Sequence, residues 1–241
     1  AVVAGSVAGN VQFLPFWVSP TGPCNGIGPV VNNNTGVTYM TIQEAIDEAT
    51  AGDVIEVSEG TYPEDLDIHT PVTIIAASSK ALPVITGTQT VNADNVTING
   101  FELTNPNGQY AITMNGYSGL QVLNNYIHDV GINNGPGTGE IISINLVNAG
   151  TGVNIEGNDI KPKRHHPENY EACINVNGIP GAPVIIHNNS LELDYDISYV
   201  PGASSDFIGI DLVNGAQSTI TENDIEYKKT QPDKFEKCIR P

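Results

Sequence analysis

Hydrophobic and polar residues alternate along the second half of the chain in a pattern that repeats. Five eight-residue segments align without gaps, and in each the third residue is aliphatic and the eighth is Leu or Ile. The segments are residues 96–103, 120–127, 153–160, 184–191 and 218–225. An alternation with a period of two residues is typical of β-strands and excludes a helix for these segments.

The last four segments share an asparagine at the sixth position, and a second alternating stretch precedes each of them. These asparagines are Asn125, Asn158, Asn189 and Asn223. The unit is therefore strand, corner, strand, corner, strand. Stacked strands lie about 4.8 Å apart, so equivalent residues of successive units form a column. Because Asn tolerates left-handed backbone angles and its amide can bond the next Asn, we interpret these four residues as a structural ladder.

The spacing of the segments predicts where loops are inserted. Successive segments begin 24, 33, 31 and 34 residues apart. The shortest spacing is close to one bare turn of a β-solenoid, and the longer ones add residues after the segment. Loop insertions are therefore expected at 131–139, 161–171 and 194–205, all on one side of the solenoid.

The first half of the chain predicts a short helix that covers the start of the stack. Thr41 and Glu44 form a capping box, and Ile42, Ala45, Ile46 and Ala49 share one helical face. Gly52-Asp53 is expected to end the helix. Strands are expected at 54–57, 66–68 and 72–76. A terminal helix of this kind closes the apolar end of a solenoid.

The run YMTIQEAIDEATAGDVIEVSEGTY at 39–62, leading to PVTII at 71–75, resembles the opening of the pectin-lyase-like right-handed parallel β-helix superfamily. The resemblance implies an all-β fold, a right-handed parallel β-helix over 38–228 with a short N-terminal capping α-helix. An N-terminal arm and extension (1–37) and a basic C-terminal tail (229–241) flank it. That superfamily includes polysaccharide lyases, glycosidases, phage tailspikes and surface proteins, so the fold leaves the activity open.

Composition and charge narrow the classes of partner. The 241 residues include 27 acidic and 9 basic side chains, for a net charge of −18. A nucleic acid or an anionic bilayer is bound by clustered Lys and Arg, so neither is an expected partner. The apolar residues 1–18 are interrupted by Gly, Pro and polar residues and are fewer than the roughly 20 that span a membrane. We expect an arm or strand there, and the start at Ala1 fits a processed, extracellular protein.

The clearest candidate for chemistry is a basic loop on the insertion side. It contains Lys161, Lys163, Arg164, His165 and His166. A polysaccharide lyase needs a base to take a proton and a cation to neutralise the uronate carboxylate, and such a loop could supply both. The alternative is a solvated basic loop that contacts an acidic neighbour. The chain matches no catalytic motif of a particular lyase family.

Carboxylate pairs offer two further candidate sites. A glycosidase needs two carboxylates across a groove, which Asp194 with Asp196 or Asp206 with Asp211 could provide. Calcium is the one candidate cofactor, near Asp65 and Asp67 or near Asp194 and Asp196, because it prefers oxygen ligands. Acids do not repeat in a column over adjacent turns, and no EF-hand or nonapeptide calcium repeat occurs.

Charge and cysteines favour assembly. Residues 1–160 carry one basic side chain against 15 acidic ones, whereas five of the nine basic residues lie in the last 14 positions. The apolar arm 11–18 and the tail 235–239 flank the solenoid, and either could cap its own chain or add a strand to a neighbour. Cys24, Cys173 and Cys238 are an odd number, so at least one is free or bridges to another chain.

We therefore expect an extracellular structural protein that assembles with itself into a surface layer, sheath or filament, resembling β-helical surface and sheath proteins of archaea. The first alternative is a polysaccharide lyase, glycoside hydrolase or carbohydrate-binding protein that uses the 161–171 loop face. The second is a trimeric phage tailspike fragment. Three Asn-X-Ser/Thr motifs permit glycosylation, at Asn33, Asn95 and Asn188.

Overall fold

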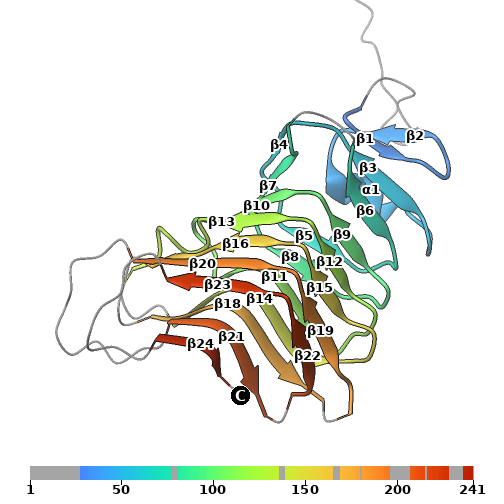
Figure 1. Ribbon diagram of the computed structural model, residues 1–241. Coiled ribbons are helices and arrows are strands. Elements are labelled where there is room, and N and C mark those ends of the chain that lie inside the picture. Colours follow the sequence, from blue (N-terminus) through green and yellow to red (C-terminus); the bar gives the residue numbers. More distant parts are fainter. Residues whose placement is uncertain are drawn as a thin grey trace, which may run out of the picture.

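The regular secondary structure of the described residues is almost all β-strand, arranged in three sheets (Figure 1). The computed structural model describes residues 28–77, 81–135, 139–164, 169–179, 181–195, 207–214, 216–227 and 236–240. Sheet A contains β1 (Val30–Asn32), β2 (Val37–Tyr39), β3 (Val54–Val57), β6 (Thr73–Ala76), β9 (Thr97–Asn99), β12 (Gln121–Leu123), β15 (Asn154–Glu156), β19 (Val184–His187) and β22 (Ser218–Thr221). Sheet B contains β4 (Thr61–Tyr62), β7 (Val84–Thr86), β10 (Glu102–Thr104), β13 (Tyr126–His128), β16 (Asp159–Lys161), β17 (Lys163–Arg164), β20 (Ser190–Tyr195) and β23 (Asp224–Tyr227). Sheet C contains β5 (Leu66–Ile68), β8 (Gln89–Val91), β11 (Tyr110–Asn115), β14 (Glu140–Ala149), β18 (Tyr170–Gly178), β21 (Phe207–Val213) and β24 (Glu236–Arg240).

From β3 onward the chain visits sheets A, B and C in turn, and we call each such passage a round. The third round, for example, is β9, β10 and β11, and the last described round is β22, β23 and β24. Neighbouring strands in a sheet come from successive rounds and pair in parallel. Among the described strands, the antiparallel pairs are β1 with β2 and β1 with β3. The prediction of an all-β fold with parallel strands is confirmed.

Inward-facing side chains from all three sheets form one hydrophobic core. The strand registers align them in columns, because each inward residue lies opposite its equivalent in the next round. The sheet A column is Ile55, Ile74, Ile98, Val122, Ile155 and Ile186, and the sheet B column is Ile85, Leu103, Ile127, Ile160 and Leu191. These residues are at most 1% exposed. They include the third and eighth residues of the first four repeated segments, and burying each one stabilises the fold by about 1.5–3 kcal/mol.

The helix α1 (Ile42–Asp47) covers the first round. Its N-cap is Thr41, and the capping box with Glu44 is present. Ile42, Ala45 and Ile46 are fully buried against the core. The helix ends at Asp47, before the predicted Gly52-Asp53. The Ala49 N–H donates to the Ile46 carbonyl, three residues back, and the Thr50 N–H donates to the Asp53 carboxylate at 2.9 Å.

The corner between sheets A and B has the same two-residue form from the third round to the last described one. Its first residue has a left-handed backbone, with φ of 86° at Gly100, 52° at Asn124, 68° at Gly157, 52° at Asn188 and 57° at Glu222. The second residue points inward, and it is Phe101 in the third round and a ladder asparagine in each later one. This geometry explains why Gly or Asn so often precedes the ladder position, since both adopt positive φ at low cost.

The connection between sheets B and C varies in length. Two residues separate β7 from β8, whereas the fourth round inserts residues 129–139 between β13 and β14. The ranges 131–139, 161–171 and 194–205 lie between the sheet B and sheet C strands of their rounds, and parts of each lie outside the described residues. Residues 161, 163–164, 170–171 and 194–195, which the prediction assigned to loops, are strand residues. The sheets extend beyond the predicted solenoid bounds, because β1 lies within the segment assigned to the arm and β24 within the segment assigned to the tail.

Candidate functional site

The four ladder asparagines form a continuous hydrogen-bonded column inside the corner of sheets A and B. Asn125 donates its backbone N–H to Asn158 Oδ1 at 3.0 Å, and Asn158 and Asn189 donate theirs to Asn189 and Asn223 Oδ1, each at 2.9 Å. Each Nδ2 group also donates to a backbone carbonyl of the preceding round, at 2.8–3.0 Å. The amides satisfy buried backbone groups in this way, which fits the structural interpretation.

The outer face of sheet B carries a charged network around Tyr126. Lys161 Nζ lies 2.9 Å from Asp159 Oδ2 and 5.3 Å from the centroid of the Tyr126 ring. The hydrogen bond to Asp159 raises the pKa of Lys161. His128 stacks on Tyr126 and places its two ring nitrogens 2.9 Å from Asp129 Oδ2 and 3.0 Å from Glu102 Oε1. These groups pair with one another, and Lys161 covers a face of the ring that could otherwise stack on a sugar.

The predicted basic loop is only partly within the described residues. Lys161 lies in β16, and Lys163 and Arg164 form β17, which pairs in parallel with β20 at Asp194 and Tyr195. His165 and His166 lie outside the described residues. The structure therefore places the first three residues along sheet B, and it does not assemble the five into a described site.

The predicted carboxylate pair of Asp206 and Asp211 does not form a described groove. Asp206 lies outside the described residues, and Asp211 is 1% exposed. Asp211 accepts hydrogen bonds from the Tyr170 hydroxyl and from Arg240 Nε, the latter at 2.7 Å. Burial, followed by the hydrogen bond to Asp211, raises the pKa of Tyr170. This cluster joins β24 to β18 and β21. Sequence reasoning missed it, because its residues lie far apart in the chain and form no motif.

Asp65 and Asp67, two of the four acidic residues named as calcium candidates, have local hydrogen-bond partners. Asp65 Oδ1 accepts the Thr88 N–H at 2.7 Å, and Asp67 Oδ1 accepts from Asn92 Nδ2 at 2.8 Å. Asp194 lies in β20, and Asp196 lies outside the described residues. Within the described ranges, no three His, Cys, Asp or Glu side chains gather in a way that could hold a metal ion.

The cysteines differ in accessibility. Cys173 is a fully buried thiol on β18, and burial raises its pKa. Cys238 is an exposed free thiol on β24. Cys24 lies outside the described residues. Because a buried thiol does not reach another chain, Cys24 and Cys238 remain the candidates for a bridge between subunits.

The three asparagines of the glycosylation motifs, Asn33, Asn95 and Asn188, are exposed. Asn33 lies in the turn between β1 and β2, and Asn188 is the left-handed residue of the corner in the sixth round. Asn95 also has positive φ, at the turn that leads into β9. All three side chains are therefore open to solvent.

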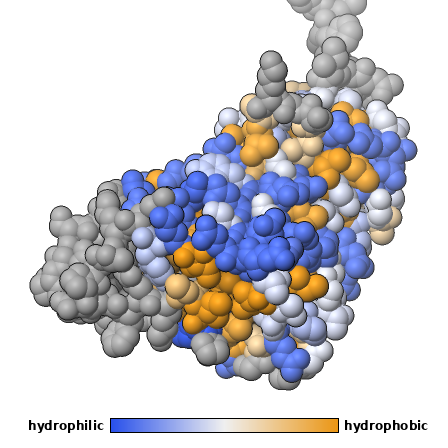
Figure 2. Space-filling model, in the orientation of Figure 1, coloured by the Kyte–Doolittle hydropathy of each residue, from blue (hydrophilic) through white to orange (hydrophobic). Residues whose placement is uncertain are grey.

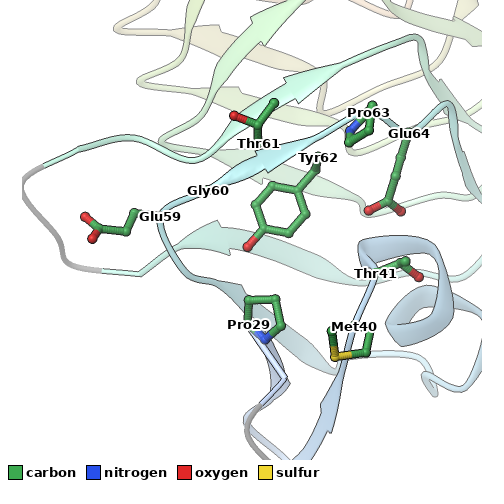
Figure 3. Close-up of a pocket in the computed structure, with 9 residues that line it drawn as sticks. All are labelled: Pro29, Met40, Thr41, Glu59, Gly60, Thr61, Tyr62, Pro63 and Glu64. Carbon is green, nitrogen blue, oxygen red and sulfur yellow. The ribbon is translucent and has the colours of Figure 1, made fainter.

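A shallow hollow of about 460 Å³ lies between the start of α1 and β4 (Figure 3). Pro29, Met40 and Tyr62 contribute its apolar lining. The Glu64 carboxylate, at one side of the hollow, accepts the N–H groups of Ile42 and Gln43 at 3.1 and 3.0 Å. The polar groups of this hollow therefore hold the helix in place.

The two ends of the stack differ. At the first round, α1 and β1 cover the core. At the last described round, Ile220 and Ile225 are only partly buried, and Ile239 is 42% exposed. Figure 2 shows an apolar area where β21 and β23 lie in Figure 1, below a hydrophilic band over sheet B. The stack thus has one closed and one open end.

Comparison with known proteins adds one similarity. No family model matches the chain. Over 109 residues the chain is 33% identical to a protein named cell surface glycoprotein from the archaeon Methanothermus fervidus. The alignment covers 43% of this chain and 18% of that protein, so the chain matches less than a fifth of its relative's length. In the part of the chain that the structure describes, no helix is long and apolar enough to cross a bilayer.

Proposed function

We propose that the rounds wind as a right-handed parallel β-helix of the pectin-lyase-like type. Strands of one sheet are parallel, and the chain returns to each sheet only after passing through the other two. Crossovers between parallel strands of one sheet are right-handed in about 98% of cases, which supports this hand. The columns of Ile, Val and Leu and the asparagine ladder are features that such a stack requires.

The proposed role of the chain is that of a structural building block at an archaeal cell surface, where it assembles with itself into a layer, sheath or filament. The observation that carries this proposal is the 33% identity to a protein named cell surface glycoprotein. The polar clusters also support a structural role. The side chains of the asparagine ladder, the Lys161 network and the Asp211 cluster bond to one another and so stabilise the scaffold.

Opposite charges and an exposed thiol support self-assembly. Residues 28–77 contain nine acidic side chains and no Lys or Arg, whereas residues 228–241 contain five basic ones. Contact between a basic tail and the acidic region of another subunit is heterologous, and such contacts produce rings or open filaments. A disulfide between Cys24 of one subunit and Cys238 of another would fix this contact covalently.

Electron microscopy of the purified chain and of its native source tests this role. We expect ordered sheets, tubes or filaments, and non-reducing electrophoresis should show multimers that collapse on reduction. Cys238→Ser should remove those multimers, whereas Cys173→Ala, at a buried position, should not. A chain that stays monomeric at high concentration, with no ordered material at its source, contradicts the proposal.

Glycosylation of the exposed motifs belongs to the same proposal. The asparagine side chains at Asn33, Asn95 and Asn188 are open to solvent, and the relative is named a glycoprotein. Mass spectrometry of peptides from the native protein should find glycan on at least one of them. Unmodified peptides at all three positions contradict this part of the proposal.

The polysaccharide-active alternative has less support, because Lys161 and His128 occupy the surroundings of Tyr126 and pair with neighbouring carboxylates. Incubation with uronate polymers tests it through the absorbance of the unsaturated product. Activity that is lost in Arg164→Ala or His165→Ala would replace the structural role with this one.

A further inference from the structure

Core positions at the open end of the stack are less covered than those of the earlier rounds. Ile220 of β22 and Ile225 of β23 continue the columns of Ile186 and Leu191, which are fully buried. In the last described round the same column positions are only partly buried. Ile239, which continues the sheet C column on β24, is 42% exposed. A further apolar layer would bury these side chains as every earlier round is buried.

The described strands of the last round lie at the edges of their sheets. Among the described strands, β22, β23 and β24 each pair with the preceding round and with no later one. The asparagine ladder reaches its last described rung at Asn223 in the same round. Exposed edges of this kind accept an added strand from another segment or chain.

We propose that the apolar segment Val11–Val18 of one copy of the chain covers the open end of a second copy. The segment reads VQFLPFWV and offers Phe13, Leu14, Phe16 and Trp17. Its one proline fits an edge strand, where a missing N–H is tolerated. This inference rests on the proposed self-assembly and identifies the surfaces that meet.

The length of the connecting chain favours a second copy over the same one. Residues 1–27 precede the described part, which begins at Gly28 beside Tyr39 of β2, at the closed end. Ten residues from Val18 to Gly28 span at most about 35 Å. The seven sheet A strands from β3 to β22 already extend about 29 Å along the stack. An arm that covered its own open end would have to run almost straight along the stack, whereas a copy stacked head to tail brings Gly28 next to that end.

Charge disfavours contact between two closed ends and so fits the same arrangement. The closed end is formed by residues 28–77, with nine acidic side chains and no Lys or Arg, whereas residues 218–241 carry five basic and five acidic side chains. Head-to-tail stacking brings the closed end against this mixed end, whereas two closed ends facing each other would place like charges together. The resulting contact is heterologous, and all copies point in the same direction along the stack.

Photocross-linking between differently labelled chains tests the inference. A benzophenone amino acid replaces Phe16 in unlabelled full-length chain, which is mixed with ¹⁵N-labelled wild-type chain before assembly. We expect cross-links from position 16 to labelled peptides that contain residues 216–227 or 236–240. Cross-links only within the unlabelled variant chain itself mean that the arm covers its own end, and cross-links elsewhere or none at all mean that another partner does. Each of these results overturns the inference.

A matched pair of substitutions provides the second test. Ile225→Asp places a charge in the open end, whereas Ile185→Asp alters an isoleucine that is 45% exposed on β19, outside the core. Sedimentation should show assembly reduced at least tenfold for Ile225→Asp and unchanged for Ile185→Asp. If circular dichroism shows that Ile225→Asp is unfolded, Phe16→Asp in the arm should give the same tenfold loss. Normal assembly of folded Ile225→Asp or of Phe16→Asp refutes this inference but leaves the proposed function intact, whereas failure of the wild-type chain to assemble removes both.

Discussion

Replacing Asn158 with alanine should be among the most destabilising single changes to the ladder. Asn158 Oδ1 accepts the backbone N–H of Asn125 at 3.0 Å, and its Nδ2 donates to Val122 O and Asn189 Oδ1, each at 2.9 Å. Asn125 and Asn158 are at most 2% exposed, so water does not take the place of the lost Asn158 amide. A buried N–H left without an acceptor costs about 1–3 kcal/mol, and each further lost hydrogen bond costs about 0.5–1.5 kcal/mol.

The expected loss for Asn158→Ala is therefore about 4 kcal/mol, a large fraction of the 5–15 kcal/mol that usually stabilises a folded protein. Urea denaturation followed by circular dichroism measures it, provided the dependence of the free energy on urea is unchanged. Asn223→Ala, at the partly exposed last rung, should cost about 1 kcal/mol because water can reach the site. Asn92→Ala removes an exposed hydrogen bond to Asp67 and should stay within about 0.5 kcal/mol of the wild type.

Two outcomes would refute this reasoning. One is a loss for Asn158→Ala no larger than that for Asn223→Ala, which would mean that the ladder amides contribute little beyond filling space. The other is full additivity of Asn125→Ala and Asn158→Ala, because two residues that share hydrogen bonds should couple by at least 0.5 kcal/mol, on the order of values for contacting residues.

Other predictions concern the corners, the helix and the C-terminal strand. Glu222→Gly should raise the free energy of unfolding by about 1 kcal/mol, and with it the melting temperature, because a Glu with φ of 57° is strained where Gly is not. Gly157→Ala should lower the free energy of unfolding by more than about 1 kcal/mol, since φ is 68° and the new Cβ would lie 2.7 Å from Asn124 Oδ1. Thr41→Ala should cost about 1 kcal/mol in a denaturation experiment, through loss of the capping box at α1. Tyr170 has a raised pKa in the folded protein, so its contribution is fully present below the ordinary value of 10.0 and is lost as the pH rises above it. Denaturation at pH 9 and pH 11 should therefore show a smaller alkaline loss for Tyr170→Phe than for the wild type, and equal losses would contradict the assignment.

The sequence predicts the strands and corners well because each round repeats the same local requirements. The alternation marks the columns of Ile155 and Ile160, and the Asn or Gly before each ladder residue marks a left-handed corner. Thr41 and Glu44 mark the helix start through a contact between near neighbours in the chain. Its end lies five residues before the predicted Gly52, because the chain leaves the helix at the Glu48 C-cap, where no Gly marks the change.

Contacts between distant segments could not be predicted. Tyr170 and Arg240 are 70 residues apart, and nothing in their neighbours indicates that both reach Asp211. The burial of Cys173 likewise depends on its position within β18, which the count of cysteines does not reveal. The cluster of basic residues from Lys161 onward predicts one loop, but Lys161, Lys163 and Arg164 are strand residues whose partners come from neighbouring rounds.

The variable connection between sheets B and C determines how this protein can change during evolution. The corner between sheets A and B keeps its two residues from the third round onward, whereas the B-to-C connection ranges from two residues to the eleven of 129–139. Insertions or deletions at that connection leave the strand registers unaltered, because the strands on either side keep their neighbours. One edge of the molecule can therefore diversify freely while the scaffold is conserved. For a protein exposed to the environment, that edge is where new recognition properties, or engineered peptides, can be accommodated at the lowest risk to folding.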